Sequence, residues 1–117
     1  MKSVFTIGKI VAFVATATAF SVSGHAFAAD AVAAEKLARQ EGCLRCHGVE
    51  RGKDGPAYKE VAAKFRGKAG AEARLLQHLS SGEKAKFPDG HEEEHKIPKT
   101  KDMDQIKNLV QWILSLT

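Results

Sequence analysis

The sequence predicts a small all-α domain, and three observations support this fold class. Apolar residues recur at spacings of three and four in several segments, which is the spacing of one helix face. Glycines and prolines stand between these segments, as they do between helices. No stretch of the 117 residues alternates apolar and polar side chains over the length of a strand. We therefore expect no strands, and we find no internal repeat.

A first helix is expected over residues 31–41. This segment is rich in Ala, Glu, Lys and Arg, which favour helices. Asp30 can cap its start, and Gly42 can end it in a left-handed turn. Val32 and Leu37 give the helix an apolar side.

Two short helices are expected in the middle of the chain, over residues 58–65 and 71–79. Glycines at positions 67, 70 and 82 separate and end them. Their apolar side chains stand at helical spacing and define the inner faces: Tyr58, Val61, Ala62, Phe65, Leu75, Leu76 and Leu79.

Residues 83–101 are polar, lack periodicity and contain two prolines, so they are predicted as one long loop. The last helix is expected to begin at Asp102, which can cap it together with Gln105. Its apolar stripe is expected to pack across the first helix, near Leu37 and Ala38. The stripe consists of Ile106, Leu109, Val110, Ile113 and Leu114, flanked by Trp112.

Residues 1–28 have the features of a cleaved secretory signal peptide. Lys2 and Lys9 form a positively charged n-region, and the apolar stretch that follows, residues 10–20, is too short to span a bilayer. An A-x-A cleavage site ends at Ala28. The mature chain is then one domain over residues 29–117, located in the periplasm. Loss of the two lysines reduces the net charge from +4 to +2, which argues against a nucleic-acid partner.

The run Cys43-Leu44-Arg45-Cys46-His47 has the Cys-x-x-Cys-His pattern that attaches a c-type haem. Two thiols three residues apart lie on the same side of a helical turn, where they can form thioether bonds to one edge of the porphyrin. The adjacent imidazole of His47 is then held as the proximal ligand of the iron. Export of the chain agrees with this prediction, because haem c is attached outside the cytoplasm.

Other metal or thiol chemistries explain the same residues less well. A Cys-x-x-Cys redox pair usually accompanies a βαβ pattern, which this chain lacks, and no further cysteine could complete a zinc site.

The segment from His91 to His95 matches the H-E-x-x-H motif of zinc proteases. That motif requires a helix, and nearby Gly90 and Pro98 leave little room for one.

Two segments, residues 43–67 and 108–115, resemble the small bacterial class I cytochromes c. The resemblance covers most of the mature chain and implies a helical domain wrapped around one covalent haem, with the N- and C-terminal helices crossing. It also implies that the carbonyl of Pro56 accepts a hydrogen bond from the proximal His47. Such a bond would fix the orientation and basicity of the imidazole.

The sequence departs from this family at the sixth iron ligand, which is usually a methionine in an Ile-Pro-Met-Pro-like turn. Here Lys99 follows Ile97-Pro98, and Met103 stands too close to Trp112 to match the family's ligand. His95 is nearer the expected position, so we predict that His47 and His95 ligate the iron. Met103, His91 and an open or exchangeable site are the alternatives. His78 is interpreted as a surface or partly packed residue.

The predicted function is electron transfer, not enzymatic catalysis. A second imidazole in place of the thioether favours Fe(III), so a low reduction potential is expected. The partners would be a redox donor and acceptor, with docking to a membrane-bound oxidoreductase possible, and the chain a monomer or a small subunit. The alternative is a protein that binds NO, CO, O2 or peroxide at an open distal site. Basic residues could steer an acidic partner if they share the haem-edge face: Arg45, Lys53, Lys59, Lys64, Arg66 and Lys68.

Overall fold

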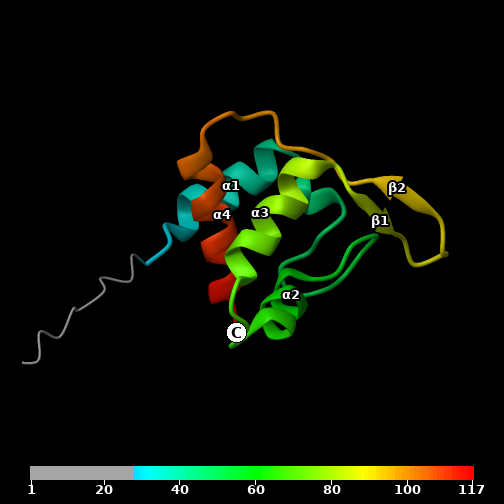
Figure 1. Ribbon diagram of the computed structural model, residues 1–117, viewed down its shortest axis with the longest axis horizontal. Coiled ribbons are helices and arrows are strands. Elements are labelled where there is room, and N and C mark those ends of the chain that lie inside the picture. Colours follow the sequence, from blue (N-terminus) through cyan, green and yellow to red (C-terminus); the bar gives the residue numbers. More distant parts are fainter. Residues whose placement is uncertain (1–27) are drawn as a thin grey trace, which may run out of the picture.

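The computed structural model describes residues 28–117, so the predicted signal peptide falls almost wholly outside the described residues. Over these residues the chain forms four α-helices, one 3-10 turn and one β-hairpin (Figure 1). In chain order the elements are α1 (Ala31–Gln40), η1 (Cys43–Arg45), α2 (Tyr58–Phe65), α3 (Ala71–Ser81), β1 (Lys84–Lys86), β2 (Glu92–Glu94) and α4 (Met103–Ser115). None of the helices in this part of the chain is long and apolar enough to cross a membrane.

Helix α4 is the centre of the fold, because it contacts α1, α2 and α3. Figure 1 shows α1 and α4 side by side, as the sequence predicts for the first and last helices. Helix α1 presents Ala34 and Ala38, which are fully buried and small enough to let α4 approach closely. The α4 side of the core consists of Ile106, Leu109, Val110, Trp112 and Ile113.

Enlarging a side chain in this contact is expected to destabilise the protein. Ala38 is 0% exposed, so Ala38→Leu should lower the free energy of unfolding by about 1–3 kcal/mol through overpacking. Ala33→Leu, on the exposed side of the same helix, should change it by less than about 0.5 kcal/mol. Denaturant unfolding of both holoproteins tests this, and equal effects would contradict close packing of α1 on α4.

Polar contacts fix the starts of these two helices. The carboxylate of Asp30 accepts a hydrogen bond from the backbone N–H of Ala33, and Asp102 accepts two from the backbone of α4, as predicted. The Asn108 side chain also pairs with the backbone of Asp30, accepting at 2.8 Å and donating at 2.9 Å. The beginning of α1 is therefore tied to the middle of α4.

The prediction of a strandless loop over residues 83–101 is wrong for residues 84–94, where β1 and β2 form an antiparallel hairpin. The register places Lys84 opposite Glu94 and Lys86 opposite Glu92, so each of these pairs joins opposite charges. The strands have only three residues each and no apolar alternation, so no strand pattern is visible in the sequence. Figure 1 shows the hairpin projecting at the edge of the molecule, away from α1.

Candidate functional site

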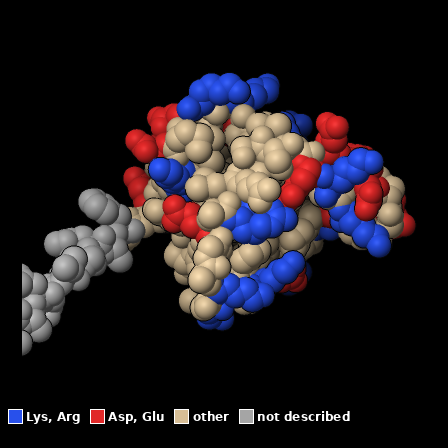
Figure 2. Space-filling model, in the orientation of Figure 1, with Lys and Arg blue, Asp and Glu red and all other residues tan. Residues whose placement is uncertain are grey.

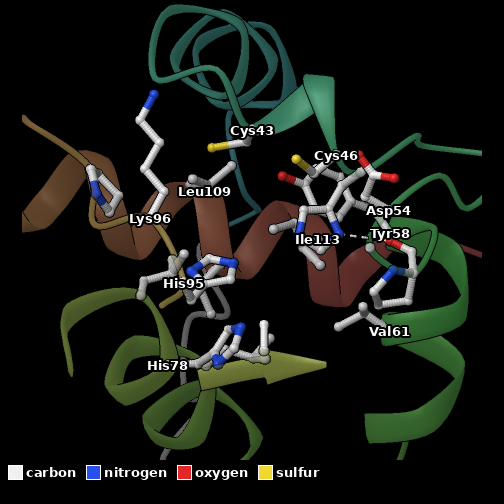
Figure 3. A pocket seen from close by; sticks show the side chains of 18 of the residues that line it. Cys43, Cys46, Asp54, Tyr58, Val61, His78, His95, Lys96, Leu109 and Ile113 are labelled. Carbon is white, nitrogen blue, oxygen red and sulfur yellow. Dashed lines mark hydrogen bonds between the residues drawn. The ribbon is translucent and has the colours of Figure 1, made fainter. Parts of the chain in front are cut away.

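A cavity of about 530 Å³ lies between η1, α2, α3, the hairpin and α4. All five cofactor-site residues that the sequence singles out line it: Cys43, Cys46, His47, Pro56 and His95. Much of the remaining wall is apolar, with Val61, Phe65, Leu75, Leu79, Leu109, Val110 and Ile113. Figure 3 shows several of these side chains around the cavity, with the Cys43 and Cys46 sulfurs on one side and His95 and His78 on another.

The attachment motif follows directly from the end of α1. Gly42 adopts φ +75°, a left-handed conformation that reverses the chain at little cost for glycine. The carbonyl of Cys43 then accepts hydrogen bonds from the backbone N–H groups of Cys46 and His47, at 3.2 and 3.0 Å. This single turn brings both thiols to the cavity edge. Burial raises the pKa of the free Cys43 thiol.

The imidazole of His47 is held by a hydrogen bond at its edge and by an aromatic ring stacked on its face. Its Nδ1 lies 2.7 Å from the carbonyl oxygen of Pro56 and donates to it, which leaves Nε2 with a free lone pair. The contact that the family resemblance implies is therefore present. The ring of Tyr58 stacks on His47 with centroids 5.2 Å apart and meets Trp112 edge-on, so the core supports the proximal ring. Burial raises the pKa of Tyr58, which stays protonated.

The imidazole of His47 packs so closely against Gly55 that any larger residue at this position would collide with the ring. A Cβ at this position would lie 2.6 Å from Cε1 and 2.8 Å from Nδ1 of His47. Gly55→Ala is therefore expected to displace the ring and break its bond to Pro56, which should increase the high-spin fraction of ferric haem. Electron paramagnetic resonance (EPR) of the holoprotein measures this. Gly52→Ala is a milder comparison, because the nearest atoms to its Cβ belong to Gly55, Ala57 and Glu60, at 3.3 Å or more; an unchanged Gly55→Ala spectrum would contradict the tight fit.

His95 lies directly after β2, and its side chain lines the cavity on a different side from the two cysteines (Figure 3). Its backbone N–H donates to the carbonyl of Glu83 at 3.0 Å, which anchors the end of the hairpin. Its ring centroid lies 6.0 Å from that of His47, and its Nδ1 is buried with no partner among the described residues. Burial, helped by the nearby His78 and His47, lowers the pKa of His95. A neutral imidazole is the form that binds metals.

The segment after His95 is fastened to the end of α1. Both carboxylate oxygens of Glu41 accept backbone hydrogen bonds, from Lys99 at 2.7 Å and from Thr100 at 3.2 Å. Glu83 thus holds this segment at His95, and Glu41 holds it at Lys99 and Thr100.

His78, interpreted from the sequence as a surface or partly packed residue, also lines the cavity, which the sequence did not predict. It is half-buried on α3, lines the cavity and contacts His95, with ring centroids 4.1 Å apart. Its Nδ1 lies 2.5 Å from the carboxylate of Glu83, which also pairs with Arg74 at 2.7 Å. These two hydrogen bonds lower the pKa of Glu83. The sequence does contain one indication that His78 faces inward. It stands three residues after Leu75, which places both on the inner face of the helix.

The other candidate ligands lie elsewhere. Met103 is 49% exposed at the start of α4, and neither Met103 nor His91 lines the cavity. His91 stacks on Phe87 in the hairpin, and its ring nitrogens face Asp89 and Glu93. The H-E-x-x-H segment is largely strand, in which residues four apart are separated by about 13 Å, too far to share one metal ion.

The side chains around the cavity fit a covalently bound haem. Two thiols stand beside a proximal imidazole with a free Nε2, and a second imidazole faces it across an apolar space. Metal–imidazole nitrogen bonds of about 2 Å place the ring centroids of two imidazoles on one metal roughly 6 Å apart. The observed separation of His47 and His95 is 6.0 Å.

Comparison with known proteins agrees with this geometry. The family model described as "Cytochrome c" matches residues 31–117. The chain is 38% identical over 84 residues to cytochrome c-551 of Pseudomonas aeruginosa, which covers 69% of this chain and 74% of that protein. It is also 38% identical over 83 residues to cytochrome c-552 of Hydrogenobacter thermophilus, covering 70% and 80% respectively.

Solved structures show the same relationship. The class 1 cytochrome MtoD from Sideroxydans lithotrophicus ES-1 is 62% identical, with a TM-score of 0.72 over 75% of this chain and 97% of MtoD. Cytochrome c552 of Nitrosomonas europaea is 30% identical, with a TM-score of 0.57 over 71% of this chain and 99% of that one. The family model spans nearly all of the described residues, so this chain belongs to the cytochrome c family and is an electron-transfer protein with one covalently bound haem c.

Proposed function

We propose that this protein is a periplasmic, low-potential electron carrier whose haem is anchored by Cys43 and Cys46 and ligated by His47 and His95. The observation that carries the proposal is the 6.0 Å separation of the two imidazole rings across the cavity. When bound, the haem iron accepts and releases one electron. The periplasmic location rests on the predicted signal peptide, residues 1–28, because haem c is attached outside the cytoplasm.

Different contacts hold the two histidines in place. Pro56 accepts the Nδ1 proton of His47, which fixes the ring and raises the basicity of Nε2. Burial lowers the pKa of His95, which favours its neutral form, and the backbone of His95 is held by the hydrogen bond to Glu83. Two neutral nitrogen donors stabilise Fe(III) more than a nitrogen and a thioether do, because the thioether raises the potential. The potential of this protein should therefore lie below that of relatives with methionine ligation.

Spectroscopy of the purified holoprotein tests the ligand set. We expect ferric, low-spin, six-coordinate haem without the near-infrared band of a methionine–Fe(III) bond. Met103→Leu should leave the spectrum and the potential unchanged, since Met103 is half-exposed and does not line the cavity. If the near-infrared band is present and is lost in Met103→Leu, methionine is the ligand and the proposal fails.

Charge around the cavity favours acidic redox partners. Figure 2 shows basic side chains gathered over the segment between β2 and α4, which contains the exposed Lys96, Lys99 and Lys101. The basic cluster suggested by the sequence is less available, because Lys59 pairs with Glu50 at 2.8 Å and Lys53 donates to the carbonyl of Leu44. Positive charge beside the cofactor would steer a soluble or membrane-bound redox protein with an acidic surface.

A further inference from the structure

His78 has the hydrogen bonding that supports a metal-binding histidine. A histidine that ligates a metal almost always donates its other ring N–H to a carboxylate or a carbonyl. His78 does so: the Glu83 carboxylate accepts from Nδ1 at 2.5 Å, so the neutral ring has its free lone pair on Nε2. Glu83 is itself held by Arg74 at 2.7 Å.

His95 lacks this support within the described residues. Its Nδ1 is buried without a hydrogen-bond partner. An imidazole whose second nitrogen has no acceptor is less firmly oriented and less basic than one that donates to a carboxylate. His95 has the ring separation from His47 that two ligands of one iron require. His78, its neighbour, has the hydrogen-bonded carboxylate that His95 lacks.

The rings of His78 and His95 are neighbours, so one could take the place of the other by moving about one ring separation. Their centroids are 4.1 Å apart, and both side chains line the same cavity as His47. Figure 3 shows His78 directly beside His95, coming from α3. Glu83 connects them, since its carboxylate holds His78 while its carbonyl holds the backbone of His95.

We propose that His78 is a second distal ligand, which binds the haem iron when His95 leaves it. This proposal rests on the haem site proposed above. In the exchange, the bond from His95 nitrogen to iron breaks and one from His78 Nε2 forms; both imidazoles remain neutral, and no electron is transferred. The protein thus keeps two nitrogen ligands in either arrangement.

The test compares His95→Ala, His78→Ala and the double variant as haem-loaded proteins, by absorption and EPR of the ferric state. We expect His95→Ala to stay low-spin with changed g-values, His78→Ala to resemble the wild type, and the double variant to be high-spin. Added imidazole should bind His95→Ala at least about tenfold more weakly than the double variant, because His78 competes for the iron. Glu83→Gln in the His95→Ala background should reduce this difference.

Each other outcome has a defined meaning. High-spin His95→Ala would overturn the role of His78 and leave His95 as the ligand, in agreement with the proposed function. A low-spin double variant would show that another residue binds the iron, which also overturns the proposal. If only His78→Ala becomes high-spin, His78 is the resident ligand, and both the exchange and the His95 assignment fail. Should His95→Ala not fold with haem, His95→Gln gives the same comparison with a polar side chain of similar size.

Discussion

Replacing Cys43 and Cys46 together by alanine is expected to give a colourless chain without a stable fold. The cavity of about 530 Å³ would then have no covalently held occupant. Without the haem, the apolar side chains that line this partly open space would face water, which costs about 1.5–3 kcal/mol for each fully exposed Val, Leu, Ile or Phe side chain. Several such side chains together would cancel much of the stability of a small domain, which is about 5–15 kcal/mol. The chain should therefore collapse or unfold instead of keeping the cavity.

Mass spectrometry and far-ultraviolet circular dichroism measure this result. The double alanine variant should have the mass of the bare polypeptide and a much reduced helical signal. Arg45→Ala is the matched control, because Arg45 stands between the two cysteines but is exposed. It should keep both the haem mass and the helical signal. A cysteine-free chain with native helix content would show that the four helices do not depend on the cofactor.

Leu109→Ala is expected to be the most destabilising single change in the core. Leu109 is 0% exposed, belongs to the α1–α4 core and also lines the cavity, so its removal opens a space that two parts of the fold share. The expected loss is about 3–5 kcal/mol. Guanidinium unfolding of the holoprotein should show a lower midpoint with an unchanged slope.

Leu114→Ala provides the comparison on the same helix. Leu114 is only partly buried, so its truncation should cost about 1 kcal/mol. If the two truncations cost the same, Leu109 is not more deeply buried than Leu114.

The four helices could be predicted from the sequence because their signals are local. Capping by Asp30 and Asp102 and the apolar spacing of α4 depend on residues within a few positions of each other. The attachment motif is also local, and one turn after Gly42 suffices to bring Cys43, Cys46 and His47 together. Such features need no knowledge of the tertiary structure.

The hairpin and His78 could not be predicted in this way, because both depend on contacts between distant segments. Lys84 and Glu94 become partners only when the strands meet, and neither residue type favours a strand by itself. A histidine between leucines on a helix is compatible with simple packing. Only the approach of Glu83 and His95 distinguishes His78 from a core residue.

Glu41 connects two distant segments of the chain. It precedes the Gly42 turn that starts the attachment motif, and its carboxylate fastens the backbone of Lys99 and Thr100, which lie 58 and 59 residues later in the chain. A chain in which the turn at Gly42 has not formed would lack a correctly placed anchor for that distant segment. Formation of the turn and closure of the segment are therefore expected to be coupled.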